Sequence, residues 1–285
     1  HGDLHLGNIV LWAGVPLLFD ALEFDDRLAS VDTLYDLAFL LMDLDAGGHR
    51  EAANLILNRI VSGPRGASEV DGLAALPLML ALRAAIRAMV GAERADQQSS
   101  ETRTDDVARA RGYLGHAIAY LAPAAPMLVA VGGFSGSGKS TLAAALAPAI
   151  GAAPGALHIR ADVERKAMFG GDEGLRLPAE AYAAEVSTRV YGMMMDKAWR
   201  ALAAGHSVVI DAVFSRPDER VAVAAAAAAA GAPFKGLWLE ARRDVLITRV
   251  EARHGDASDA TSAVVAGQIA RGVGDVTWTT IEAGG

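Results

Sequence analysis

The residues with the clearest chemical meaning form the run Gly133-Phe-Ser-Gly-Ser-Gly-Lys139-Ser140-Thr141. This run matches G-x-x-x-x-G-K-[ST], follows a short apolar segment and precedes a helical one. Glycines allow the backbone to fold around a phosphate with its N–H groups pointing inward, and the helix adds the positive end of its dipole. A lysine at this place reaches the β- and γ-phosphates, and the next hydroxyl is a Mg²⁺ ligand. The spacing predicts a nucleotide and Mg²⁺ site, rather than a ligand-free turn, at Gly133, Ser135, Gly136, Ser137, Gly138, Lys139, Ser140 and Thr141.

A second component of such a site is an acid at the end of a buried strand. The run Val208-Val-Ile-Asp211 fits this description. We predict that Asp211 reaches the Mg²⁺ through the water shell of the ion, which Mg²⁺ gives up reluctantly. The alternative is that Asp211 only ends the strand.

The back half of the sequence alternates short apolar runs with helical segments. Most runs are continuously apolar, as expected for parallel strands covered on both faces. This order predicts a doubly wound α/β sheet of the P-loop NTPase kind over 127–285. The predicted strands are 127–131, 156–160, 207–210, 236–239 and 276–280, and the predicted helices are 140–150, 163–169, 179–204, 217–230 and 244–253.

Two absent signatures narrow the class of protein. No Asn-Lys-x-Asp or Thr-Lys-x-Asp segment for reading guanine follows the P-loop run, and no Leu-Ser-Gly-Gly-Gln signature of transporter ATPases is present. The domain resembles the small-molecule kinase branch of the P-loop fold, which includes gluconate kinase, shikimate kinase, chloramphenicol phosphotransferase and zeta-toxin-like kinases. The resemblance implies an ATP- and Mg²⁺-dependent phosphotransferase that acts on a hydroxyl of a small molecule.

The same resemblance gives roles to further residues. Asp162 follows the second predicted strand, where related kinases place an acid that accepts the proton of the attacking hydroxyl; the alternative is a helix N-cap. Arg249 and Arg253 lie at i and i+4 in a segment that resembles the kinase lid, so the resemblance implies one arginine near adenine and one on the transferred phosphate. An exposed arginine face is the alternative. Arg160 and Arg165 are candidates for holding an anionic acceptor or for surface salt bridges.

The front half contains a different phosphotransfer signature. His1-Gly-Asp3-Leu-His5-Leu-Gly-Asn8 matches H-x-D-x-x-x-x-N, and Phe19-Asp20 follows at the end of an apolar run. With these motifs, residues 1–121 resemble part of an aminoglycoside phosphotransferase. The resemblance implies that Asp3 is the catalytic base, that Asn8 and Asp20 are Mg²⁺ ligands, and that Asp36 ties the loop down.

Around this signature we predict a mainly helical kinase-like C-lobe fragment that carries one β-hairpin. Asp32 is a predicted N-cap, and Pro123 and Pro126 make 122–126 a short linker. The predicted hairpin strands are 9–12 and 15–19, the helices are 33–45, 50–61, 76–95 and 104–121, and 96–101 is a loop.

The front half lacks one element that its resemblance requires. The phosphate-binding lysine of a kinase-like N-lobe has no counterpart, because all four lysines follow residue 126. Since the chain begins at His1 and not at Met, we expect it to be processed or cut from a longer two-kinase protein, with the front half idle as it stands. The alternative function is an aminoglycoside-kinase-like enzyme whose P-loop domain is a regulatory ATP-binding module.

Composition excludes several other classes. The net charge is −8, which is unfavourable for a nucleic-acid partner, and the absence of cysteine excludes disulfides, thiolate metal sites and cysteine nucleophiles. No uninterrupted apolar run reaches the ~18–20 residues of a membrane span. We therefore expect a cytoplasmic protein with a small-molecule acceptor and neither nucleic acid nor membrane as a partner.

Overall fold

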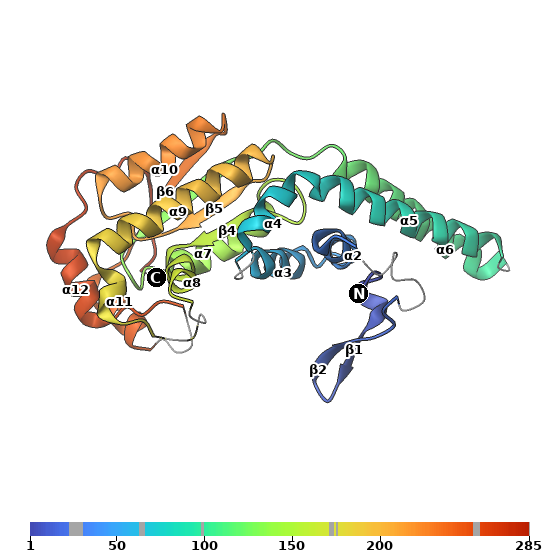
Figure 1. The fold of residues 1–285 in the computed structure, drawn as a ribbon, viewed down its shortest axis with the longest axis horizontal. Helices are drawn as coiled ribbons and strands as arrows, with labels where there is room; N and C mark the ends of the chain where they lie inside the picture. The colour runs from blue at the N-terminus through green and yellow to red at the C-terminus, as the bar shows by residue number, and fades with distance from the viewer. Residues whose placement is uncertain are drawn as a thin grey trace. The chain divides into compact units, whose positions relative to one another are not determined.

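The computed structural model describes residues 1–22, 31–62, 66–97, 100–170, 174, 176–252 and 257–284. The chain divides into two compact units, which we call the front unit and the P-loop unit (Figure 1). The front unit consists of His1–Leu57, Gly72–Ala124 and Ala152–Gly155, and the P-loop unit consists of Asn58–Asp71, Ala125–Gly151 and Ala156–Gly285.

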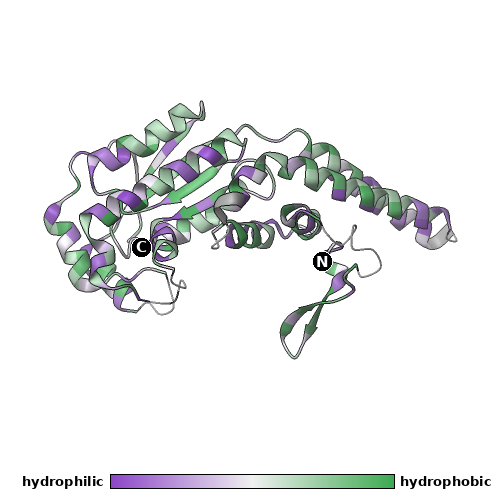
Figure 2. Ribbon diagram, in the orientation of Figure 1, coloured by the Kyte–Doolittle hydropathy of each residue, from purple (hydrophilic) through white to green (hydrophobic). Residues whose placement is uncertain are grey.

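The P-loop unit is built on one five-stranded sheet in which all neighbouring strands are parallel, in the order β4-β5-β3-β6-β7. The sequence prediction of a doubly wound sheet with the P-loop NTPase fold is confirmed. Strand β3 lies in the centre between β5 and β6, so its carboxyl end is the point where the strand order reverses. Strands β3 and β5 are mostly apolar and buried along their whole length, and Figure 2 shows hydrophobic strands at the centre of this unit. The strands are β3 (Leu128–Gly133), β4 (Leu157–Arg160), β5 (Val208–Asp211), β6 (Phe234–Glu240) and β7 (Thr279–Glu282).

Helices cover both faces of this sheet. Figure 1 shows α9 and α10 on one face and α7 on the other. Val129, Val131 and Val209 pack with Ala143 of α7 in a buried cluster, which joins the P-loop helix to the central strands. The helices are α7 (Lys139–Leu146), α8 (Ala161–Met168), α9 (Ala184–Ala203), α10 (Pro217–Ala229), α11 (Arg243–Glu251) and α12 (Ser262–Arg271), with short 3₁₀ turns η3 (Ala147–Ala149) and η4 (Ala179–Tyr182).

Three helical segments differ from the sequence prediction for local reasons. α7 ends at Leu146 because Pro148 lacks the N–H that a continuing helix needs. The helix predicted over 179–204 is divided, since Ala183 is extended and separates η4 from α9. The carbonyl of Ala181 in η4 accepts a hydrogen bond from the Arg165 side chain at 2.7 Å. α12 was not predicted at all.

The front unit is mainly helical and carries an antiparallel hairpin whose register runs from Ile9 opposite Leu18 to Trp12 opposite Val15. Ala13 and Gly14 both have positive φ, as a two-residue hairpin turn requires. Asp32 caps α2 as predicted, and its Oδ1 accepts from Leu34 N at 2.8 Å. The elements are η1 (Leu6–Asn8), β1 (Ile9–Trp12), β2 (Val15–Leu18), α2 (Thr33–Ala46), η2 (Leu73–Ala75), α5 (Leu76–Asp96) and α6 (Ser100–Tyr120); α3 (Arg50–Ser62) crosses the division at residue 57, and α4 (Gly66–Gly72) was not predicted.

One helical stretch among the described residues, Glu69–Asp96, is long and apolar enough to cross a membrane by length and composition. The sequence analysis missed it because it looked for uninterrupted apolar runs, and Arg83 and Arg87 interrupt this one. Core helices of soluble proteins pass the same test. In the front unit, α5 packs against α2 and α6 and buries Leu76 and Leu80.

Arg220 of α10 fixes two stretches of backbone, one after β5 and one between α12 and β7. Its guanidinium donates to the carbonyls of Phe214 (2.7 Å), Ser215 (3.2 Å), Val273 (2.8 Å) and Asp275 (3.0 Å), and the residue is only 6% exposed. Arg220→Met would leave these carbonyls without a donor, so we expect it to lower the free energy of unfolding by about 2–4 kcal/mol in urea denaturation.

The control for this prediction is Arg242→Met. Arg242 pairs with Asp244 at 2.9 Å, but both side chains are largely exposed. An exposed ion pair contributes about 0–1 kcal/mol, so this variant should unfold close to the wild type. If Arg220→Met lowered the free energy of unfolding no more than Arg242→Met, water would have replaced the guanidinium as the donor to these carbonyls in the Arg220→Met variant.

Candidate functional site

The loop between β3 and α7 has the backbone that a phosphate site requires. Gly133, Gly136 and Gly138 have φ of 140°, 86° and 94°, a region that side-chain-bearing residues rarely adopt. A Cβ on Gly136 would lie 2.5 Å from the carbonyl oxygen of Leu246, and one on Gly133 would lie 2.6 Å from that of Leu239. Gly133 and Gly136 are therefore required by shape as well as by torsion, and Gly138 is required by torsion.

The loop is held from α12 by one buried side chain. Gln268 Oε1 accepts from Ser135 N at 2.9 Å, and Gln268 Nε2 donates to Ser135 Oγ at 3.1 Å. Ser135 and Gln268 are both buried, with exposed fractions of 7% and 8%. This amide fixes the loop without contacting its central glycines, and no local sequence pattern pointed to it.

Lys139 and Ser140 begin α7 at the end of the loop. Lys139 Nζ donates to the carbonyl of Phe134 at 3.0 Å, so the ammonium lies on the loop. Ser140 Oγ donates to Asp211 Oδ1 at 3.2 Å. A hydroxyl and a carboxylate oxygen are hard ligands of the kind Mg²⁺ prefers, and Mg²⁺ completes its shell with water and phosphate. The donor set fits Mg²⁺, although no group of three or more acidic or histidine ligands occurs among the described residues.

Asp211, at the end of β5, is held by basic groups from β4. His158 Nε2 lies 2.6 Å and Arg160 Nε lies 3.8 Å from Asp211 Oδ2. Burial alone would raise the pKa of Asp211, but the hydrogen bond from His158 and the charges of His158, Arg160 and Lys139 bring this pKa below its ordinary value. The carboxylate is therefore ionised and has its Oδ1 turned toward Ser140.

Asp162 lies in the first turn of α8, directly after β4. The N-cap of α8 is Arg160, so the alternative that Asp162 is the N-cap is wrong. Burial raises the pKa of Asp162 above its ordinary value, while a hydrogen bond from Ser258 and the charge of Lys139 act against this rise. A carboxylate with a raised pKa is suited to accept a proton.

A pocket of about 780 Å³ brings the main predicted residues together. Lys139, Ser140, Asp162 and Asp211 all line it. Sequence analysis did not predict most of its other polar lining residues, which include Arg176, Tyr182, Tyr191, Glu219, Asp259 and Arg271.

Arg165 is a further lining residue, one that the sequence offered as an acceptor ligand. It is 7% exposed, its Nη1 donates to the Ala181 carbonyl at 2.7 Å, and its guanidinium lies 5.0 Å from the ring centroid of Tyr182. Its Nε is buried and has no hydrogen-bond partner among the residues that the structure describes. A buried donor of this kind is available to an anionic group.

Of the two arginines predicted for the lid, Arg249 is the one that the structure describes. Arg253 lies outside the described residues. Arg249, on α11, donates from Nη1 to the carbonyl of Ala283 at 2.7 Å and is not among the described lining residues of the pocket. A role for Arg249 at adenine stays a prediction.

Gly136 gives a test of how tightly the loop packs on α11. We expect Gly136→Ala to lower the free energy of unfolding by about 1–3 kcal/mol, because the new Cβ meets backbone at 2.5 Å with φ at +86°. The control is Gly192→Ala on α9, where an added Cβ meets nothing within 4 Å. Because Gly192 lies within a helix, this variant should raise the free energy of unfolding by about 0.5–1 kcal/mol. Thermal unfolding measures both, and equal signs would contradict the packing argument.

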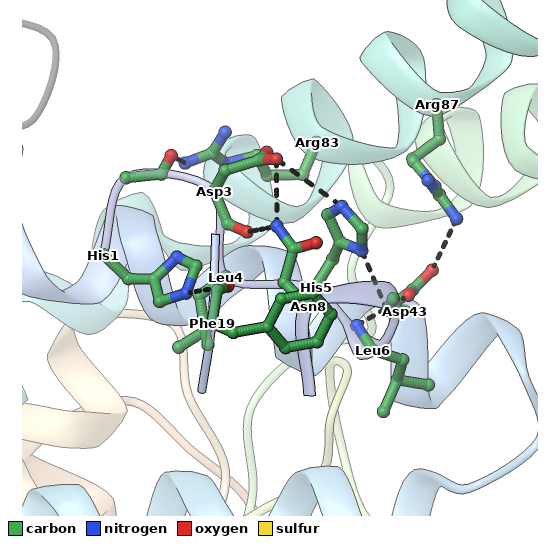
Figure 3. Close-up of polar contacts among 12 residues, drawn as sticks. His1, Asp3, Leu4, His5, Leu6, Asn8, Phe19, Asp43, Arg83 and Arg87 are labelled. Atoms are coloured by element: carbon green, nitrogen blue, oxygen red, sulfur yellow. Dashed lines mark hydrogen bonds and ion pairs between the residues drawn. The ribbon is translucent and has the colours of Figure 1, made fainter. Parts of the chain in front are cut away.

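The catalytic-loop signature of the front unit is also ordered (Figure 3). Asn8 Nδ2 donates to the carbonyl of Asp3 at 2.9 Å and to Asp3 Oδ2 at 3.3 Å, so the predicted base and metal ligand are neighbours. Phe19 N donates to the Asn8 carbonyl at 3.1 Å, which brings the end of the hairpin, and hence Asp20, next to this loop. Asp20 has a φ of 60°.

Two acids of α2 tie this loop down. Asp36 Oδ1 accepts from Leu4 N at 3.4 Å, in line with its predicted structural role, and Asp43 Oδ2 accepts from Leu6 N at 3.1 Å. From α5, Arg83 Nη2 donates to the Gly2 carbonyl at 3.3 Å. The sequence indicated Asp36 but neither Asp43 nor Arg83.

Curated relatives match almost the whole length of the chain. Uncharacterized proteins of Mycobacterium tuberculosis and Mycobacterium bovis are 32% identical over 277 residues, which is 95% of this chain. The chain spans 53%, about half, of the length of these relatives.

Two solved structures are similar to a little more than half of the chain. A protein of Chloroflexus aurantiacus is 23% identical and has a TM-score of 0.44 over 56% of this chain and 90% of its own. A gluconokinase from Sinorhizobium meliloti is 21% identical and has a TM-score of 0.38 over 55% of this chain and 83% of its own. The AAA domain family (AAA_33) matches residues 128–272, from the first residue of β3 to just past α12, and the chain belongs to this family.

Proposed function

We propose that the P-loop unit is an ATP- and Mg²⁺-dependent phosphotransferase that acts on a hydroxyl group of a small acceptor. The observation that carries this proposal is the pocket, which places Lys139 and Ser140 of the phosphate loop beside the carboxyl groups of Asp162 and Asp211. A domain that only senses ATP has no need of a half-buried carboxylate with a raised pKa beside its phosphate loop.

Each residue then has a defined task. Loop N–H groups from Gly133 to Thr141 bind the polyphosphate, and the Lys139 ammonium leaves the Phe134 carbonyl to bind the β- and γ-phosphates. Ser140 and Asp211 would hold Mg²⁺, and the bound ion would supply positive charge beside the phosphates. Asp162 orients the acceptor hydroxyl and takes its proton as the new bond forms.

The acceptor side of the pocket favours an anionic molecule. Arg165 carries the buried, unpartnered Nε, and Arg176 lines the same pocket. A planar guanidinium binds carboxylate and phosphate groups well. We therefore place hydroxylated acids, such as sugar acids, first among the acceptor classes.

The direct test is an acceptor screen with γ-labelled ATP and Mg²⁺, beside calorimetry of MgATP binding to the full chain. We expect Mg²⁺-dependent binding and label transfer to an acidic polyol in preference to its neutral counterpart. A chain that takes up no MgATP would overturn the proposal. A chain that binds MgATP but labels no acceptor would favour the ATP-sensing alternative.

The loop of the front unit supports a second candidate function. The contact between Asn8 and Asp3, and the hairpin that brings Asp20 to it, fit an aminoglycoside-kinase-like site in the full-length protein. If this second function is the right one, the P-loop unit is an ATP-binding module that regulates the front unit, and Lys139 does not take part in turnover. Aminoglycosides therefore belong in the same screen.

A further inference from the structure

His158 of β4 lies on the face of the sheet that is turned toward α7. In the register of β4 and β5, Arg160 lies opposite Asp211. His158, two residues earlier, lies opposite Val209, which packs with Ala143 of α7. Because side chains alternate between the two faces of a strand, His158 and Asp211 share this face. The sheet therefore brings the imidazole ring to the carboxyl group at the end of β5.

The backbone of His158 is fixed from outside the sheet. β4 ends the strand order, and along its outer side Asn58 of α3 pairs with the backbone. Asn58 Oδ1 accepts from His158 N at 2.6 Å, and Asn58 Nδ2 donates to the carbonyl of Ala156 at 3.3 Å. Asn58 belongs to the P-loop unit, as β4 does. The ring therefore projects from a strand that is held along both of its sides.

The imidazole ring holds one oxygen of Asp211 and leaves the other to Ser140. His158 Nε2 lies 2.6 Å from Asp211 Oδ2, and the two side chains are only 10% and 7% exposed. An ionised carboxylate only accepts, so Nε2 carries the proton and donates. The second oxygen, Oδ1, accepts from Ser140 Oγ at 3.2 Å. Because the carboxyl group turns as one plane about its bond to Cβ, fixing Oδ2 also determines where Oδ1 points.

We propose that His158 is a positioning residue of the Mg²⁺ site, which holds Asp211 so that Oδ1 faces the hydroxyl of Ser140. The inference rests on the proposed function, in which Ser140 and Asp211 would hold the ion. Mg²⁺ requires nearly ideal octahedral geometry, so a carboxylate that turns away from this direction serves it poorly. A residue that orients a metal-site carboxylate by a hydrogen bond typically changes metal affinity by about 10–100-fold when it is replaced.

Arg160 is a second basic residue beside this carboxylate, and distance separates its role from that of His158. Arg160 Nε lies 3.8 Å from Asp211 Oδ2, which is too far for a hydrogen bond. It contributes charge, whereas the short bond from His158 sets a direction. The two roles predict opposite effects. A cation beside a metal ligand repels Mg²⁺, so loss of a charge would strengthen Mg²⁺ binding, whereas loss of a positioning bond weakens it.

The test is calorimetry of ATP binding to the full chain, with EDTA and over a series of Mg²⁺ concentrations. His158→Gln places an amide N–H where Nε2 lies, and His158→Asn carries the same amide on a side chain too short to reach Asp211. We expect His158→Asn to raise the Mg²⁺ concentration that half-maximally enhances ATP binding by about 10–100-fold. His158→Gln should stay close to the wild type. ATP binding in EDTA should be equal in all three proteins, because the phosphate loop is unchanged.

A measurement on the wild type completes the test without a substitution at this position. A ring N–H held by a buried carboxylate exchanges slowly with water, so the Nε2 proton of His158 should give a signal in ¹H–¹⁵N spectra. This signal should shift when Mg²⁺ is added to the ATP-bound chain. The exposed His49 is the control, and its ring signals should not respond.

Four results would overturn this inference and leave the proposed function intact. They are an unchanged or lower Mg²⁺ requirement in His158→Asn, an equal defect in His158→Gln, weaker ATP binding in EDTA, and a ring signal that ignores Mg²⁺. ATP binding that does not respond to Mg²⁺ in the wild type would instead remove the proposed function, and this inference with it.

Discussion

Lys139→Ala is expected to weaken MgATP binding by roughly ten- to a hundredfold, because charge-assisted hydrogen bonds to phosphate are worth ~1.5–3 kcal/mol. Turnover should fall by a further ~10²–10³-fold, since the ammonium also stabilises charge that develops on the transferred phosphate. Calorimetry and the labelled-ATP assay measure the two effects separately. The fold should survive, because Gln268 holds the loop at Ser135 without using Lys139.

The matched control is Lys235→Ala, which removes an exposed lysine on β6 and leaves the phosphate loop unchanged. It should bind and turn over MgATP like the wild type. If both variants lost binding equally, the loss would reflect overall charge rather than the loop. Turnover of an aminoglycoside that persists in Lys139→Ala would assign catalysis to the front unit.

Positions that depend on local backbone could be predicted from the sequence. The glycine spacing of 133–141 specifies a loop, and the continuous apolar strands specify a parallel sheet. Because parallel strands end at one edge of the sheet, the same pattern placed Asp211 beside Ser140. Asp162 follows from this logic too, since it comes directly after β4.

Positions that depend on distant contacts could not be predicted. Gln268 meets Ser135 across 133 residues of sequence, and Asp259 meets Leu177 across 82. Gln268 and Asp259 both lie between the predicted helix 244–253 and the predicted strand 276–280, where no element was predicted, so α12 was missed. A usable signal was present: Thr261 is a good N-cap type, and Val265 and Ile269 have helical spacing.

Asp162→Asn is expected to lower turnover by about 10²–10⁴-fold while MgATP binding stays within a few-fold of the wild type. The loss follows from the base alone, because the amide cannot take the acceptor proton. The dependence of activity on pH gives a second test of this role. Burial raises the pKa of Asp162, so the acid limb of wild-type activity should lie at a higher pH than an ordinary aspartate would give. The residual activity of the variant should lack this limb.

Stability distinguishes this role from a structural one. An acid whose pKa is raised in the folded state loses stability when it ionises, so the Asp162 charge acts against folding at neutral pH. Asp162→Asn removes that charge, and its free energy of unfolding at neutral pH should therefore equal or exceed that of the wild type. Asp211→Asn is the contrast. Its pKa is lowered in the folded state, so its charge favours folding above the ordinary range of an aspartate, and removing it should destabilise the protein. If Asp162→Asn instead unfolded more easily, its loss of activity would reflect damage to α8 and not the loss of a base.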